Sequence, residues 1–122
     1  MAAMAAASAK PRTLPAGDDA IDRDHLARMA LGDPSLEREV LRLFDRQSEL
    51  LLARMNAAPA AAIATLAHTL KGSARGIGAW RVAEAAEAVE RTAGRDQKGA
   101  GIALAQLTTA IGAARTAIAA ML

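Results

Sequence analysis

This 122-residue chain has no cysteine and no tyrosine, and only one tryptophan and one phenylalanine. Without cysteine, disulfides, thiolate metal sites and cysteine nucleophiles are excluded, which is compatible with a reducing cytoplasm. The scarcity of aromatic residues, together with abundant alanine and leucine, favours helices over a β-sandwich or barrel. A Gly-rich phosphate loop ending in Lys-Ser or Lys-Thr is also missing. A single domain of this length is too short for a kinase with its own nucleotide site.

The chain carries little excess charge of either sign. Its 15 basic and 13 acidic residues leave a formal net charge of +2, although the isoelectric point is near 9.7. No dense basic run is present, so we expect solvated mixed-charge helix faces rather than a nucleic-acid surface. No secretory signal is recognisable. Arg115 and several threonines interrupt the apolar stretches, which do not reach the roughly 18 residues of a membrane span. We therefore expect a cytoplasmic monomer without nucleic-acid or membrane partners.

Capping and breaking residues divide the chain into a tail and five helices. Residues 1–20 are predicted to be a disordered tail, and residues 21–122 a single domain. The predicted class is all-α: an antiparallel up-and-down four-helix bundle with a short additional N-terminal helix. The expected boundaries are Ile21 to Gly32, Asp33 to about Asn56, Pro59 to Gly78, Trp80 to Gly94, and a final helix after a polar loop from Asp96 to Gly101.

Apolar residues at helical spacing predict which face of each helix is buried. In the second helix this stripe consists of Leu36, Val40, Leu43, Phe44, Gln47, Leu51 and Met55. In the third it consists of Ile63, Leu66, Ala67, Leu70, Ser73, Ala74 and Ile77. Trp80 is expected to plug one end of the bundle. His25 is expected to be a solvated or capping residue, and Glu84, Glu87 and Glu90 to be solvated.

His68 is the strongest candidate for chemistry. At about 100° per residue it points roughly 160° away from Leu70 and therefore faces water. Lys71 and Arg75 lie one and two turns further along the same face, and such cations favour a neutral, nucleophilic imidazole. They would also pair with a phosphoryl group bound to the ring.

Gly72 lies one turn after His68, where a helical glycine costs about 1 kcal/mol relative to alanine. Its missing Cβ leaves room for another molecule to approach the imidazole. Ala64, Thr65 and Gly76 fall near the same face and are expected to contact that molecule. A metal site is less well supported, because no histidine or carboxylate lies three or four residues from His68 and the nearby cations repel metal ions.

The run from His68 through Leu70, Lys71, Gly72, Ser73 and Ala74 to Gly78 resembles the phosphorylation-site helix of histidine phosphotransfer (HPt) domains. Upstream, Ile21-Asp22, Leu26, Gly32-Asp33 and Leu43-Phe44 resemble the opening of that family, so the likeness covers about residues 21 to 121. The resemblance implies that His68 relays a phosphoryl group between aspartates of receiver domains in two-component signalling. It also implies an upstream hybrid histidine kinase and a Mg²⁺ ion bound by the receiver, with no intrinsic cofactor. The family's fourth helix can bring Glu90 near the phosphorylation site.

Two other interpretations are open at this stage. A helical adaptor or nucleoid-associated protein would use its basic helix surfaces without phosphotransfer. A degenerate HPt fold would bind a receiver without accepting phosphate, although the intact His68 and Lys71 argue against this. Whether a carrier that is itself phosphorylated is called an enzyme is a matter of definition.

Overall fold

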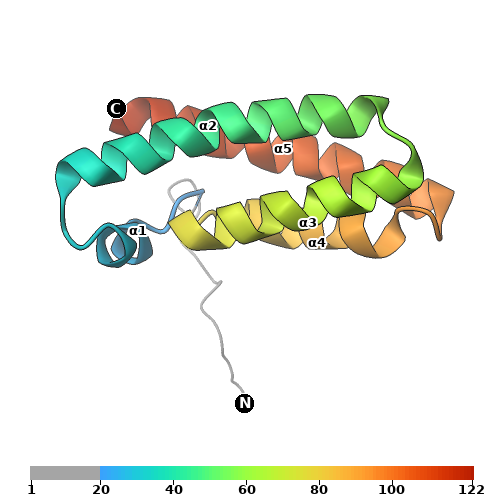
Figure 1. Cartoon of the computed structure of the whole chain (residues 1–122), viewed down its shortest axis with the longest axis horizontal. Helices are drawn as coiled ribbons and strands as arrows, with labels where there is room; N and C mark the ends of the chain where they lie inside the picture. The colour runs from blue at the N-terminus through green and yellow to red at the C-terminus, as the bar shows by residue number, and fades with distance from the viewer. Residues whose placement is uncertain (1–19) are drawn as a thin grey trace, which may run out of the picture.

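The computed structural model describes residues 20–122, which form five helices and no strand. These are α1 (Arg23–Met29), α2 (Pro34–Ala57), α3 (Ala60–Ile77), α4 (Trp80–Thr92) and α5 (Gln97–Met121). Figure 1 shows α2 and α5 along one side of the bundle, α3 and α4 along the other, and α1 at one end. The predicted all-α bundle with a short first helix is therefore confirmed. Most of the predicted tail lies outside the described residues, but Ala20 is already buried.

The four long helices form a closed ring of neighbours. Within residues 20–122, α2 packs on α3 and α5, and α4 packs on the same two helices. The backbones of the diagonal pairs, α2 with α4 and α3 with α5, stay more than 8 Å apart there, measured between Cα atoms, and only side chains meet across the core. The short α1 packs on α3 and α2. Each long helix therefore keeps one outer face, and the outer faces of α2 and α4 belong to different sides of the molecule.

Side-chain caps and left-handed glycines set the helix ends. Asp22 and Asp33 accept hydrogen bonds from the first amides of α1 and α2, and Pro34 occupies the first turn of α2. Gly78 ends α3 with a φ of 82°. A Cβ on Gly78 would lie 2.9 Å from the backbone oxygen of Asp22. Only glycine therefore allows this close turn from α3 to α4.

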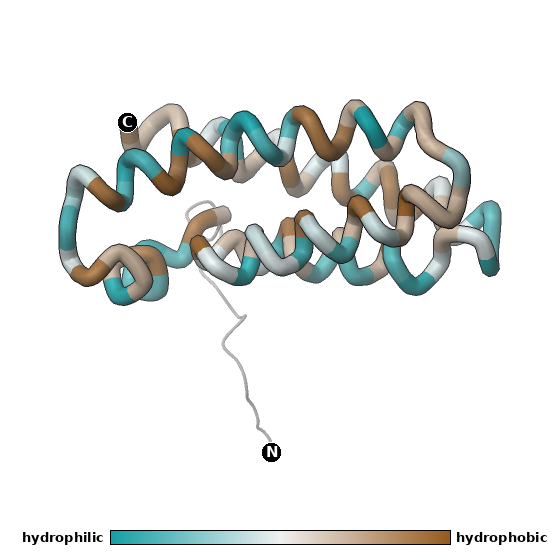
Figure 2. The backbone as a smooth tube through the Cα atoms, viewed as in Figure 1, coloured by the Kyte–Doolittle hydropathy of each residue, from teal (hydrophilic) through white to brown (hydrophobic). Residues whose placement is uncertain are grey.

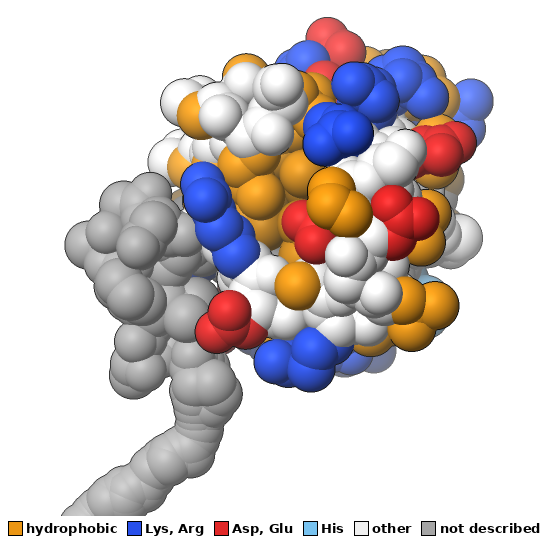
Figure 3. All heavy atoms as spheres, turned by 90° about the vertical axis from the view of Figure 1, so that its left-hand side faces the viewer, with side chains coloured by type: hydrophobic (Ala, Val, Ile, Leu, Met, Phe, Trp, Pro, Cys, Tyr) orange, Lys and Arg blue, Asp and Glu red, His pale blue; other side chains and the backbone are white. Residues whose placement is uncertain are grey.

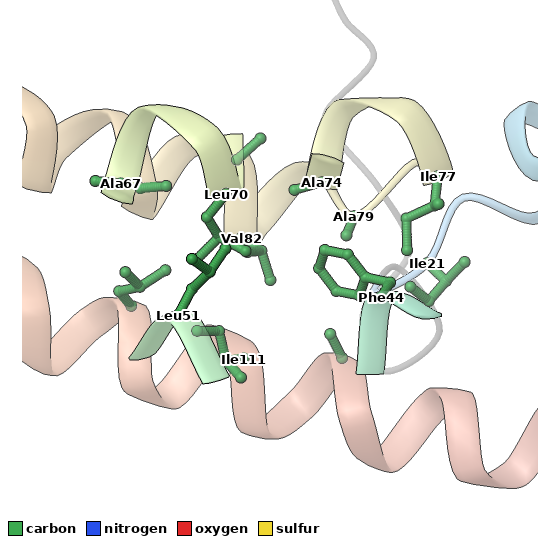
Figure 4. Packing of buried hydrophobic residues seen from close by; sticks show 14 of the residues in the cluster. Ile21, Phe44, Leu51, Ala67, Leu70, Ala74, Ile77, Ala79, Val82 and Ile111 are labelled. Carbon is green, nitrogen blue, oxygen red and sulfur yellow. The ribbon is translucent and has the colours of Figure 1, made fainter. Parts of the chain in front are cut away.

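The core lies between the two pairs of helices and contains mostly small and aliphatic side chains. Figure 4 shows Leu51, Leu70, Val82 and Ile111 meeting in its centre, one from each long helix. Phe44 contributes the only buried aromatic ring in the described range, and it lies next to Ile21 and Ile77 (Figure 4). The many alanines at helix contacts let the backbones approach closely, so a chain with few large side chains still forms a continuous core.

The predicted buried face of α2 is rotated by about a sixth of a turn from the observed one. Phe44, Leu51 and Met55 are buried as expected, but Leu41 and Ser48 complete the inner face. Leu36 and Leu43 are exposed instead. Ser48 is tolerated in the core because its hydroxyl donates to the carbonyl oxygen of Asp45 at 3.0 Å. Helix α2 thus carries two apolar stripes, and periodicity alone does not decide which one faces inward.

The start and the apolar character of α5 also differ from expectation. The helix begins at Gln97 rather than after Gly101, because Asp96 caps it by accepting from the Gly99 amide at 3.0 Å. By length and composition it could cross a membrane, which corrects the sequence-based prediction. This is weak evidence for a membrane, because Arg115 in α5 donates to Asp45 of α2 at 2.8 Å and five of its residues are in the core. The hydrogen bond that Arg115 donates to Asp45 holds the pKa of Arg115 above its ordinary value.

Candidate functional site

His68 faces outward from α3, as its position in the helical period predicts. Its side chain is 66% exposed, whereas Ala67 and Leu70 beside it are fully buried in the core. The backbone of α3 is held by contacts with α2 and α4 on its two sides. The imidazole is therefore fixed at its base and open to an incoming molecule at its tip.

Glu90 of α4 connects His68 to Lys71. One carboxylate oxygen lies 2.8 Å from Nδ1 of His68, and the other accepts from Nζ of Lys71 at 2.7 Å. The hydrogen bond from Lys71, assisted by the one from His68, holds the pKa of Glu90 below its ordinary value. Glu90 is therefore a carboxylate at neutral pH and can only accept, so Nδ1 of His68 carries the proton. Nε2 then keeps its lone pair and points away from Glu90 into solvent.

Arg75 lies on the same face but has a different partner. Its guanidinium donates to Glu87 of α4 at 3.3 Å, and Arg91 donates to the second oxygen of Glu87 at 3.3 Å. Both arginines are more than half exposed, so these pairs are screened and easily exchanged. Lys71 is thus joined to His68 through Glu90, whereas Arg75 forms the rim of the site.

The row of residues that contains His68 along α3 otherwise has only very small side chains. Counting in steps of four, it consists of Ala64, His68, Gly72 and Gly76. A Cβ added to Gly72 or Gly76 would meet nothing within 4 Å. The space beside the imidazole is therefore open on its C-terminal side. Thr65 is exposed next to this row, and its hydroxyl donates to the Ala61 carbonyl at 3.4 Å.

Helix α1 is attached at the end of α3. His25 lies with its Nε2 3.0 Å from the carbonyl oxygen of Arg75, and its ring packs against Trp80 at 4.9 Å between centroids. Trp80 in turn donates from Nε1 to Asp22 at 2.9 Å. Burial acts to raise the pKa of Asp22, but the hydrogen bonds from Trp80 and the His25 amide outweigh it and leave the pKa lowered. His25 is thus a packing residue, and Trp80 closes this end of the bundle as predicted.

The described residues contain no cluster of three or more histidine, cysteine or acidic side chains that could hold a metal ion. Figure 3, which shows the α1 end of the bundle, has Lys and Arg side chains in separate groups with Asp and Glu among them.

The contact between Glu90 and His68 is not predicted from the residues of α4, where Glu90 is expected to be solvated. Its spacing in α4 fits a solvated position equally well, and its distance from His68 depends on how α4 is aligned with α3. The only signal in the sequence was the position of the family's fourth helix.

A bundle that presents one outward histidine, with a carboxylate on its inner nitrogen and an open space beside it, defines a carrier that can accept and release a phosphoryl group. The family model for the Hpt domain matches residues 37–117, and the chain belongs to this family. Its function is histidine phosphotransfer in two-component signalling, and the adaptor or nucleoid alternative is not favoured. Hpt domains interact with receiver domains and histidine kinases in phosphorelays.

Comparison with solved structures supports the fold. The chain is similar to the X-ray structure of a rice protein assigned as a histidine-containing phosphotransfer protein, with a TM-score of 0.74 and 18% sequence identity. The match covers 84% of this chain and 79% of the rice chain. No curated protein sequence matches the chain.

Proposed function

We propose that His68 is the phosphorylated residue, accepting a phosphoryl group from the aspartyl phosphate of one receiver domain and passing it to the aspartate of another. The observation that carries this proposal is the pairing of an exposed Nε2 with an Nδ1 that lies 2.8 Å from Glu90. A ring held in this tautomer has its lone pair on the atom that an approaching domain can reach.

In the proposed step, Nε2 of His68 attacks phosphorus, an N–P bond forms, and the O–P bond to the receiver's aspartate breaks. The proton on Nδ1 stays in the hydrogen bond to Glu90, whose carboxylate balances the positive charge that develops on the ring. Onward transfer is the reverse of this step at a second receiver. Catalysis of this kind depends mainly on in-line positioning and on stabilisation of charge.

The neighbouring residues support the transfer in two ways. Lys71 is 14% exposed and its ammonium lies 2.7 Å from Glu90, the carboxylate that also contacts His68, so we place it as the cation that pairs with the phosphoryl oxygens. Arg75 would exchange Glu87 for the same oxygens. Gly72 and Gly76 leave the approach open, and Ala64 and Thr65 would contact the receiver.

The proposed reaction needs an aspartate, a Mg²⁺ ion and a source of phosphate, and partner proteins would supply them. The receiver would supply the aspartate and the Mg²⁺ ion that neutralises phosphate charge. An upstream hybrid histidine kinase would load the first receiver. We propose that one bundle is the transferring unit, and that it acts in the cytoplasm without a nucleic-acid or membrane partner.

Incubation with a phosphorylated receiver tests the assignment. Acid-labile, alkali-stable phosphate should appear on the wild-type chain and should be absent from His68→Gln. His25→Gln is the matched control, because His25 packs against Trp80 and should not affect labelling. Undiminished labelling of His68→Gln would refute the proposal.

A further inference from the structure

Helix α2 exposes a second apolar stripe that the core does not use. Leu36, Leu43 and Leu50 are 37%, 52% and 51% exposed. They lie seven residues apart, which is two helical turns or about 10 Å, so all three share one line along the helix. The recurring apolar segments along α2 can be followed in Figure 2. Exposed leucines at this regular spacing are the pattern of a helix that packs against another helix.

Beside this leucine stripe (Leu36, Leu43 and Leu50), one charge of each sign flanks the central leucine at nearly equal distances along the helix. Glu39 lies four residues before Leu43, and Arg46 lies three residues after it. Both side chains are exposed, and neither has an ion pair within residues 20–122. Two α2 helices related by a two-fold axis at Leu43 would run antiparallel. Glu39 of one copy would then lie beside Arg46 of the other, and the contact would occur twice.

The leucines fit the same symmetry. An axis at Leu43 brings the two copies of this residue together and places Leu36 opposite Leu50 of the second copy, because both are seven residues from the axis. In a parallel pairing in register, the two-fold axis would place Glu39 and Arg46 of one copy on the opposite side of the contact from those of the other, so no pair of opposite charges would form between them. The stripe is therefore complementary to itself in one orientation only.

We propose that the leucine stripe binds a second copy of this chain, forming an antiparallel α2–α2 dimer. The surface is small, so association is weak, with a dissociation constant on the order of 0.1 mM. The sequence-based expectation is a monomer. The proposed dimer replaces it only at high protein concentration. His68 lies on the face shared by α3 and α4, and α4 lies diagonally across the bundle from α2 in the described range, so the dimer leaves the relay site open.

Sedimentation equilibrium of the full chain measures the association. At roughly 1 mM the average mass should approach twice the 12.6 kDa of one chain, and dilution should return it to the single-chain value. Leu43→Arg should abolish the increase. Ile102→Arg, at a 54% exposed position on α5, is the matched control and should leave it unchanged. A single-chain mass for the wild type at the highest concentration would overturn the proposal.

Charge exchange tests the predicted symmetry. Glu39→Arg and Arg46→Glu should each weaken self-association about tenfold, because like charges then meet twice in the homodimer. An equimolar mixture of the two variants should dimerise again, because every such contact then joins opposite charges. Failure of the mixture to recover would refute the antiparallel arrangement. Phosphotransfer to His68 should be normal in all of these variants. A different outcome would be slower transfer by Leu43→Arg while both the wild type and the variant keep the single-chain mass. The stripe would then be a receiver-docking surface, and the dimer would be excluded.

Discussion

Glu90 uses its two carboxylate oxygens differently, since one fixes the tautomer of His68 and the other holds Lys71. Glu90→Gln removes the negative charge, and its amide can donate to Nδ1 and thereby favour the wrong tautomer. We expect phosphotransfer to slow about tenfold, the effect of losing one charge-assisted hydrogen bond. Rapid-quench labelling from a phosphorylated receiver measures this rate.

The control for that variant is Glu37→Gln, because Glu37 lies on α2, diagonally across the bundle from α4 in the described part of the chain. Its transfer rate should match the wild type. Equal rates for Glu90→Gln and the wild type would show that Glu90 only supports the structure of the site.

Two substitutions of Gly72 should affect the stability of the fold and the access of a receiver to His68 in different ways. A Cβ at this position meets nothing within 4 Å, so Gly72→Ala should raise the free energy of unfolding by about 0.5 to 1 kcal/mol with little loss of transfer. Gly72→Trp should keep the helix but slow transfer at least about tenfold, because the indole would occupy the space beside the imidazole. Urea denaturation and the labelling assay give the two quantities. Normal transfer by Gly72→Trp would contradict the role of Gly72 in access.

Local periodicity predicts the direction of a side chain but not its partner on another helix. His68 faces outward because Ala67 and Leu70 must face inward, and this follows from α3 alone. Its contact with Glu90, and the pairing of Arg75 with Glu87, depend on the alignment of α3 with α4. A difference of one turn in that alignment would place another α4 residue beside the ring.

At the level of helices, replacing a glycine by alanine should have opposite effects on stability at Gly78 and at Gly112. Gly78 has a φ of 82° and lies against Asp22, so Gly78→Ala should lower the free energy of unfolding by about 2 kcal/mol or more. Gly112, in the interior of α5, has nothing within 4 Å of an added Cβ, so Gly112→Ala should raise it by about 0.5 to 1 kcal/mol. Urea denaturation of both variants measures the contrast. Equal effects of the same sign would show that the α3–α4 turn is not constrained as described.

The number, order and approximate ends of the helices could be predicted from the sequence because Asp22, Asp33 and Gly78 act locally. The rotation of α2 could not, because the predicted buried face and the observed one share Phe44 and Leu51 and differ mainly in the leucines at their edges. The early start of α5 was missed because Gly99 and Gly101 resemble a loop, although Asp96 caps the helix before them.

For the whole molecule, the lowered pKa values of Asp22 and Glu90 predict how stability depends on pH. A carboxyl group whose pKa is lower in the folded state stabilises the fold above its unfolded pKa, and this contribution disappears as pH falls through the folded value. The ordinary values are 3.8 for Asp22 and 4.5 for Glu90. The free energy of unfolding should therefore be nearly constant from about pH 7 to about pH 5 and should fall below about pH 4.5.

Urea denaturation at about pH 6 and about pH 3.5 measures this change. The Asp22→Asn, Glu90→Gln double variant should be less stable at the higher pH and should lose less stability between the two values. If the double variant lost as much stability as the wild type, other carboxyl groups would account for the acid sensitivity.

The row formed by Ala64, His68, Gly72 and Gly76 has a consequence for how this protein distinguishes among signalling pathways. Main chain and methyl groups offer few features that differ from one visiting receiver to the next, so the centre of the contact is permissive. Discrimination then falls to the charged border, where Glu87 and Arg91 can change without disturbing the chemistry. Changing which receiver this protein binds should therefore require substitutions at that border and none in the row itself.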